Sequence, residues 1–256
     1  MPTHPYLDHP APLAIAHRGG TESAPENTVA AFRAATEVGF RHLETDVHLT
    51  ADGVLVAFHD DELDRVTDGE GRLATLTWAE VGQARIGGTE PIPTLDELLE
   101  TFPDTNFNID PKSDDAVLAL VATLRRHDAL ARVCVGAFSD DRLRRLRTLV
   151  GPDLCTAAGP LEMTGLIGSA RIGRTVTGRG TTTPYRCVQV PVRHRKVEIV
   201  TPQLISAAHD RGLHVHVWTI DEPAEMHRLL DMGVDGIMTD RPSVLRGVLE
   251  RRGEWH

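Results

Sequence analysis

Side chains able to act on a phosphate ester occur close together near the start of the chain. His17 and Arg18 follow one short apolar run, Glu44 and Asp46 lie within the next, and His59 follows a third. Glu44 and Asp46 are two residues apart in a strand-like segment, so their side chains point to the same side. Two carboxylates so placed favour a cation between them, and hard oxygen ligands suit Mg²⁺ or Ca²⁺, with Mn²⁺ as a further candidate. This set is typical of a metal-assisted phosphoryl-transfer site.

His17 and His59 each end an apolar run, so both could reach one substrate from opposite sides of the carboxylates. An imidazole titrates near neutral pH, which suits a pair of them to act as general acid and general base on a phosphodiester. The residues alone leave open which of the two is the acid. The alternative for each is a hydrogen-bonded structural histidine, and Arg18 beside His17 and Asp60 beside His59 count against it.

The segment Asn-Ile-Asp-Pro-Lys supplies a third carboxylate, Asp110, and two residues later a lysine, Lys112. Asp110 ends a predicted strand next to the one with Glu44 and Asp46, so it can be a third oxygen ligand. Lys112 can hold a phosphate oxygen as a point charge. The alternative for this group is an ordinary ion pair at the rim of the sheet.

The alternation of β-branched apolar runs with stretches of helical period predicts the fold. Eight such runs favour a parallel sheet closed into a TIM (β/α)8 barrel, with a doubly wound open sheet as the alternative. The predicted strands are Leu13–His17, His42–Val47, Asn106–Asp110, Arg132–Phe138, Leu154–Ala157, Cys187–Val190, Leu213–Trp218 and Gly236–Thr239. The predicted helices are Thr28–Val38, Asp114–His127, Asp140–Leu149, Leu161–Ile172, Thr201–Arg211, Glu222–Met232 and Ser243–Arg251, with a Gly- and Thr-rich connection over Arg171–Tyr185.

One stretch interrupts this order after the second strand. Asp52-Gly53 predicts a turn into Val54–His59, and residues 61–93 are polar and glycine-rich before a helix over Leu95–Thr101. We expect residues 61–93 to form a small insertion over the barrel mouth, within a single domain of residues 1–256.

The composition narrows the class of protein. With 256 residues, 41% hydrophobic and 25% charged, the chain has the size and balance of one globular barrel. A formal net charge of -10 argues against nucleic acid as a partner. The first residues lack a signal-peptide pattern and no run of about 18 apolar residues occurs, so we expect a cytoplasmic protein whose lipid contacts are at most peripheral. The oligomeric state does not follow from the sequence.

Three cysteines, Cys134, Cys155 and Cys187, are odd in number and far apart, so neither a disulfide framework nor zinc-site spacing is indicated. Each adjoins an apolar run, and we expect small buried side chains. His214 and His216 share one side of a predicted strand, a spacing also found in metal sites. The carboxylates already account for a metal, so we interpret these two histidines as residues of the barrel interior.

Four segments together resemble the glycerophosphodiester phosphodiesterase family: HRGGTESAPENT, ETDVHLTADGVLVAFHDDELDRVTDGEG, NIDPK and VHVWTIDEPAEMHRLLDMGVDGIMTDRP. The resemblance extends from Leu13 to Pro242. It implies a TIM barrel with a small segment inserted after the second strand, a divalent metal and two catalytic histidines. Related phospholipase D toxins share the first part of the pattern but are secreted and disulfide-bonded.

That resemblance implies a role for each site residue. The roles are metal ligand for Glu44, Asp46 and Asp110, acid or base for His17 and His59, phosphate binding for Arg18 and Lys112, and a pocket wall against the glycerol for Trp218. Glu26 would lie in the loop that packs beneath the site, and Asn27 would cap the following helix. Asp110 departs from the family, which more often has Glu there, so the identity of the metal stays open.

The implied reaction releases sn-glycerol 3-phosphate and an alcohol from a small glycerophosphodiester. A glycerol hydroxyl attacks phosphorus, one histidine removes its proton, the other protonates the leaving alcohol, and water then opens the cyclic phosphate. The alternatives are a lysophospholipase D, a noncatalytic barrel that binds phosphodiesters, and a metal-dependent amidohydrolase. A binding barrel needs no acid and base, and an amidohydrolase has a His-x-His pair at its first strand, where this chain has His17 and Arg18.

Overall fold

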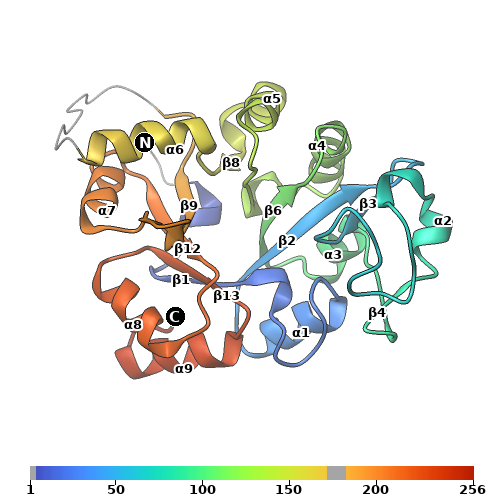
Figure 1. The fold of residues 1–256 in the computed structure, drawn as a ribbon, viewed down its shortest axis with the longest axis horizontal. Coiled ribbons are helices and arrows are strands. Elements are labelled where there is room, and N and C mark those ends of the chain that lie inside the picture. Colours follow the sequence, from blue (N-terminus) through green and yellow to red (C-terminus); the bar gives the residue numbers. More distant parts are fainter. Residues whose placement is uncertain (1–3, 172–182) are drawn as a thin grey trace.

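Eight short parallel strands form a nearly closed barrel with helices around it (Figure 1). The computed structural model describes residues 4–171 and 183–256. The strands follow one another around the barrel in chain order, and a bridge between Ala157 and Cys187 joins the two ends of that order, so the predicted barrel is confirmed and the open sheet excluded. The strands are β1 (Leu13–Ala16), β2 (His42–Leu49), β6 (Asn106–Pro111), β7 (Val133–Val135), β8 (Cys155–Thr156), β9 (Cys187–Pro191), β12 (His214–Trp218) and β13 (Gly236–Thr239).

Helices on the outside of the barrel connect successive strands. Several begin at a hydroxyl side chain that accepts a backbone N–H of the first turn, and others begin with proline, whose missing N–H costs nothing there. Across residues 4–171 and 183–256, no helix is long and apolar enough to span a membrane. The helices are α1 (Val29–Glu37), α3 (Leu95–Thr101), α4 (Ala116–Arg126), α5 (Asp140–Val150), α6 (Pro160–Arg171), α7 (Pro202–His209), α8 (Pro223–Asp231) and α9 (Pro242–Arg252). Short 3-10 turns are η1 (Pro5–Leu7), η2 (His17–Gly19), η4 (Leu130–Arg132) and η5 (Gly151–Asp153), and a small hairpin is formed by β10 (Arg193–His194) and β11 (Val197–Glu198).

The segment after β2 forms a small unit at one side of the barrel, to the right in Figure 1. It consists of β3 (Leu55–Ala57), η3 (Leu73–Thr75), α2 (Trp78–Val81), β4 (Arg85–Ile86) and β5 (Glu90–Pro91). A separate apolar cluster that includes Phe58 and Leu73 holds it together. The N–H of Phe58 also donates to the carbonyl of Asp46 at 3.0 Å, which anchors the unit at the end of β2.

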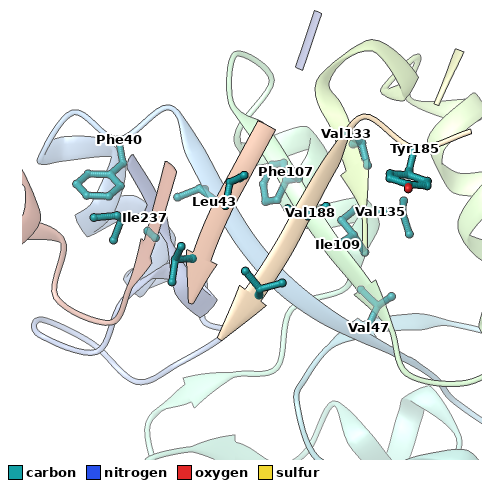
Figure 2. Close-up of a cluster of buried hydrophobic side chains, with 14 of the residues drawn as sticks. Phe40, Leu43, Val47, Phe107, Ile109, Val133, Val135, Tyr185, Val188 and Ile237 are labelled. Atoms are coloured by element: carbon teal, nitrogen blue, oxygen red, sulfur yellow. The ribbon is translucent and has the colours of Figure 1, made fainter. Parts of the chain in front are cut away.

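Apolar side chains fill two layers, one outside and one inside the strands. Figure 2 shows part of the outer layer, where Leu43 of β2 is the register partner of Phe107 of β6. Burial of each such side chain stabilises the fold by about 1.5–3 kcal/mol. Because alternate residues of a strand face opposite ways, the outward Leu43 and Val47 leave Glu44 and Asp46 pointing into the barrel. The outer core therefore sets the direction of these carboxylates.

The predicted strands are all present, with shifted ends. β2 continues to Leu49 because β3 pairs with its last residues. β7 is shorter than the predicted Arg132–Phe138 because β8 offers it only two partners. His17, predicted to end the first strand, begins a tight turn. The predicted helix Leu161–Ile172 corresponds to α6, but its last residue and most of the connection Arg171–Tyr185 lie outside the described residues.

His42, inside the barrel at the start of β2, makes stability depend on pH. Its Nε2–H donates to the carbonyl of Tyr6 at 3.0 Å, and burial lowers the pKa of its imidazole from 6.5 to about 3. Between these values the unfolded chain binds more protons than the folded one, so the free energy of unfolding falls as the pH falls. We expect the wild type to lose up to about 1.4 kcal/mol per pH unit relative to His42→Gln between about pH 6 and pH 4, measured by urea unfolding. If the free energy of unfolding changed with pH in the same way in the two proteins, His42 would not be neutral in the folded chain.

Candidate active site

Three carboxylates lie on β2 and β6 toward the C-terminal ends of these strands. Glu44 and Asp46 are buried on β2, and Asp110 of β6, largely buried, is the register partner of Asp46. Burial and then the charge of Asp46 raise the pKa of Glu44 to about 7. Burial likewise raises the pKa of Asp110, against the effect of nearby Lys112. This end of the barrel therefore favours the binding of positive charge.

Two cationic side chains neutralise part of the negative charge of these carboxylates. Lys112 Nζ lies 2.6 Å from Asp46 Oδ1 and 2.9 Å from Asp110 Oδ2. Burial alone would lower the pKa of Lys112, but the two carboxylates raise it, so the ammonium group stays charged. Arg18 Nε lies 3.3 Å from Asp46 Oδ2 without making a hydrogen bond to it. The predicted phosphate-binding residues thus lie directly beside the predicted metal ligands.

Some carboxylate oxygens have no hydrogen-bond donor and could bind a metal. Asp46 Oδ2 and Asp110 Oδ1 are buried without a hydrogen bond. A buried carboxylate oxygen left in this way is costly unless a cation approaches it. Together with Glu44 these residues offer an all-oxygen set, which hard divalent cations such as Mg²⁺, Ca²⁺ and Mn²⁺ prefer. The type of donor suits the cation that the sequence predicts, and the three carboxylates would have to draw closer together to bind it, since their oxygens do not all lie within 4.8 Å of one another.

His17 lies in the turn after β1, next to the carboxylates. Its Nδ1 is 2.8 Å from Asp240 Oδ1 and its Nε2 is 3.8 Å from Glu44 Oε2. Asp240, just after β13, is itself positioned because its N–H donates to Asp221 Oδ1 at 2.8 Å. Burial alone would lower the pKa of His17, but Glu44 and Asp240 raise it. The pairing at Nδ1 leaves Nε2 as the atom that can exchange a proton with a substrate.

His59 is brought to the same end of the barrel by the start of the insertion. The His48 ring donates Nε2–H to the carbonyl of His59 at 3.0 Å. His59 Nδ1 lies 2.5 Å from Asp60 Oδ1, and Arg65 binds the other oxygen of Asp60. Burial opposes ionisation of Asp60, but Arg65 and His59 lower its pKa to about 2. Arg65 Nη2 also donates to Glu26 at 2.5 Å, so a residue of the insertion contacts the rim of the site.

The turn after β1 brings backbone close to the carboxylates. Arg18 has a left-handed φ of 53°, and its N–H donates to Glu44 Oε2 at 2.9 Å. Gly19 and Gly20 follow with φ of 83° and 84°. A Cβ on Gly20 would lie 2.6 Å from Pro242 at the start of α9, and one on Gly19 would collide with α1 in the same way. The two glycines therefore let the turn pack directly against both helices.

Asn27 does not cap α1, contrary to the prediction. Its φ of 56° is left-handed, whereas a capping residue is extended, and Thr28 takes that position by accepting the N–H of Ala31 at 3.0 Å. Asn27 instead accepts a hydrogen bond from Thr45 Oγ1 at 2.8 Å. It ties the loop to β2 between the two carboxylate positions. Glu26 lies at the rim of the site, where it accepts from Arg18 Nη1 at 3.1 Å.

Trp218 ends β12 at the same face and is half-buried. Its ring meets Phe138 edge to face, with ring centroids 5.9 Å apart. Phe138, in the loop after β7, is 73% exposed, and Leu161, in the first turn of α6, is 72% exposed. The N–H of Leu161 donates to Asp140, two residues beyond Phe138, so the start of α6 is joined to the start of α5. We call Phe138, Leu161 and Trp218 the apolar lip.

Four residues near the site were not predicted from the sequence. Asp240 had a signal, since it directly follows the last strand, where barrel sites lie. Arg65 lies in the irregular insertion, Phe138 in the loop after β7 and Leu161 in the first turn of α6. The closed barrel decides which residues lie next to them, so spacing along the sequence could not reveal them.

The fold and this site together are those of a (β/α)8-barrel hydrolase. A family model described as the glycerophosphoryl diester phosphodiesterase family matches residues 17–244. The chain belongs to this family and is a phosphoric diester hydrolase.

Relatives of known name support the assignment. "Probable glycerophosphodiester phosphodiesterase 2" of Mycobacterium tuberculosis is 40% identical, over 99% of this chain and 97% of its own length. A glycerophosphodiester phosphodiesterase of Caldanaerobacter subterraneus is 31% identical, over 94% of this chain and 99% of its own. The crystal structure of a glycerophosphodiester phosphodiesterase from Agrobacterium tumefaciens superposes with a TM-score of 0.75 at 25% identity, covering 91% of this chain and 99% of that one.

Lys112→Met tests the charge balance at the carboxylates. Without the ammonium group Asp46 and Asp110 face each other buried, so we expect a loss of about 3–5 kcal/mol in the free energy of unfolding in the presence of EDTA. Added Mg²⁺ or Ca²⁺ should recover part of the loss. Lys196→Met, on the exposed hairpin, is the matched control and should change stability by less than about 0.5 kcal/mol in urea unfolding. Equal effects of the two substitutions would contradict this account.

Proposed function

We propose that this chain hydrolyses glycerophosphodiesters to sn-glycerol 3-phosphate and an alcohol, using a divalent cation and two histidines. The observation that carries the proposal is the pair of histidine–carboxylate contacts, His17 with Asp240 and His59 with Asp60, beside the buried carboxylates of β2 and β6. A site built only to bind a phosphodiester needs positive charge but no oriented acid and base. The names of the relatives point to the same substrate class.

Substrate binding rests on the charges at the barrel mouth. Arg18 and Lys112 can each approach a nonbridging phosphate oxygen, since both already lie beside carboxylates that a cation would engage. Glu44, Asp46 and Asp110 would hold the divalent cation, which supplies charge neutralisation on those oxygens when bound. The two side chains and the donor set therefore act on the same phosphate group.

Proton transfer rests on the two imidazoles. One histidine takes the proton of the glycerol hydroxyl as its oxygen bonds to phosphorus, and the other gives a proton to the alcohol oxygen as its bond to phosphorus breaks. The cyclic phosphate is then opened by water, with the two roles reversed. Asp240 and Asp60 hold the Nδ1 atoms, so the exchanging nitrogen is Nε2 in both residues. The proposal places this reaction in the cytoplasm, which agrees with three free cysteines.

A lysophospholipase D activity is the second candidate, and the apolar lip favours it. Exposed Phe138 beside Trp218, together with exposed Leu161, offers apolar surface at this end of the barrel, where the acyl chain of a lysolipid could lie. Such a substrate would bring a peripheral contact with lipid. A panel that includes a lysophospholipid separates the candidates, and Phe138→Ser should lower only its hydrolysis.

The central test is release of glycerol 3-phosphate by protein stripped with EDTA, with Mg²⁺, Ca²⁺ or Mn²⁺ restored singly. We expect activity only with metal, and a fall in kcat of about 10²–10⁴-fold in His17→Ala and in His59→Ala, because each removes an acid or base. His209→Ala, whose ring pairs with Asp235 elsewhere, is the matched control and should keep its activity. Release without metal, or unchanged in the two variants, would overturn the mechanism, and binding without release would favour the noncatalytic barrel.

Asp240→Asn tests the positioning of His17. The amide can keep the contact at Nδ1 but no longer stabilises the charged imidazole, so we expect kcat to fall by about 10²-fold or more with little change in KM. Asp235→Asn is the matched control, since Asp235 pairs with His209 at 2.7 Å outside the site. Equal losses in the two variants would show that only folding had been disturbed.

A further inference from the structure

The barrel interior contains a cluster of three thiols. Cys134 of β7, Cys155 of β8 and Cys187 of β9 are fully buried, and their Sγ atoms all lie within 4.8 Å of one another. Cys134 Sγ and Cys187 Sγ are 3.7 Å apart although 53 positions separate them in the chain. The sequence correctly predicts their burial, but their widely spaced positions conceal that three adjacent strands bring them together. We call them the thiol cluster.

The thiol cluster lies where two neighbouring strands of the barrel share the fewest backbone pairings. β8 and β9 are the two ends of the strand order, and between them only the bridge of Ala157 with Cys187 completes the circle among the described residues. Cys155 lies on one side of this seam and Cys187 on the other. Any bond between these two side chains would therefore close the barrel covalently or through a ligand.

Two buried polar side chains beside the thiol cluster have no hydrogen-bond partner. His216 of β12 is fully buried, and neither of its ring nitrogens makes a hydrogen bond. β12 pairs with β9, the strand of Cys187, and His216 is the register partner of Gln189, two residues beyond Cys187. The hydroxyl of Tyr6 is also buried without a partner and packs among the three cysteines. Such groups are costly unless something satisfies them, so the interior is incomplete as a purely apolar core.

The donor types and spacing fit a tetrahedral metal site. With zinc–sulfur distances of about 2.3 Å, two thiolates of such a site lie about 3.8 Å apart, close to the observed 3.7 Å. Three sulfurs and one imidazole are a common ligand set for structural zinc. Sulfur is a poor ligand for Mg²⁺ and Ca²⁺, so this set and the carboxylates of the mouth select different ions.

We propose that Cys134, Cys155 and Cys187 hold one structural Zn²⁺ inside the barrel, where it ties β8 to β9, and that the His216 ring moves closer to the three sulfurs to become the fourth ligand. Binding replaces the three thiol protons, which leave to solvent as the metal enters during folding. The Tyr6 hydroxyl can then donate to a ligating thiolate and orient it. The site is separate from the carboxylates, so it stands or falls independently of the proposed reaction.

Cobalt(II) is the probe, because thiolate ligands give Co²⁺ an intense charge-transfer absorption that oxygen ligands do not. The reduced full chain is unfolded in denaturant together with a chelator. Both are then removed, and the chain is refolded without oxygen in the presence of Co²⁺. We expect thiolate charge transfer that saturates at one Co²⁺ per chain and is lost on addition of one equivalent of Zn²⁺. Protein as isolated should keep one zinc after EDTA dialysis, and zinc should raise its melting temperature.

Variants identify the ligands. Cys155→Ser should lower the charge-transfer intensity by roughly a third or more, since one of three sulfur ligands is removed. His216→Asn should shift the spectrum or abolish binding, whereas His214→Asn on the same strand should leave it unchanged, as should Glu44→Gln in the carboxylate set. If these variants fail to fold, the cobalt spectrum of the wild type still shows whether thiolates bind the metal. Absence of thiolate absorption, a disulfide within the cluster, or retention of copper(I) with exclusion of zinc would each overturn the proposal.

Discussion

The burial of like charges at one end of a closed barrel is the constraint on which the rest of this site depends. Glu44 and Asp46 cannot turn away, because the outward residues of β2 are held in the apolar layer under the helices. Residues two apart on a strand are about 7 Å apart along the backbone, and two unit charges at that distance repel by about 2 kcal/mol at an effective dielectric constant of about 20. That is a large share of the roughly 5–15 kcal/mol by which a domain is stable. The N–H of Arg18, which donates to Glu44, and the Lys112 ammonium group beside Asp46 reduce this repulsion.

The sequence predicts most features that depend on how side chains alternate along a strand or repeat along a helix. Alternation within β2 places Glu44 and Asp46 on one side, and parallel pairing puts Asp110 beside them. The partner of His17 could not be predicted with equal ease, since Asp240 lies 223 positions away and meets it only because β1 pairs with β13. The error at Asn27 has a local cause. Its left-handed backbone moves the start of α1 by one residue, and residue type alone does not distinguish Asn from Thr as a cap.

Carboxylates and thiols are segregated along the axis of this barrel. The carboxylates gather at the C-terminal ends of the strands, while the thiols lie inside among the apolar residues of the inner layer. The inner layer draws its members from strands that are distant in the chain, so cysteines without any motif spacing become neighbours once the circle closes. Barrel closure thus creates the thiol cluster, just as it creates the contact between His17 and Asp240.

The glycines of the His-Arg-Gly-Gly turn are required by the packing of the fold and not by the chemistry of the site. Gly19 and Gly20 are required by the close approach of α1 and α9, a demand that would persist in a barrel that catalysed nothing. A relative could lose its histidine and still retain both glycines, because folding alone selects for them. Recognition of this turn in a genome therefore reports ancestry and packing. Under the proposed mechanism, whether such a relative is an enzyme is read from the two histidine–carboxylate contacts, His17 with Asp240 after the neighbouring strand β13, and His59 with Asp60.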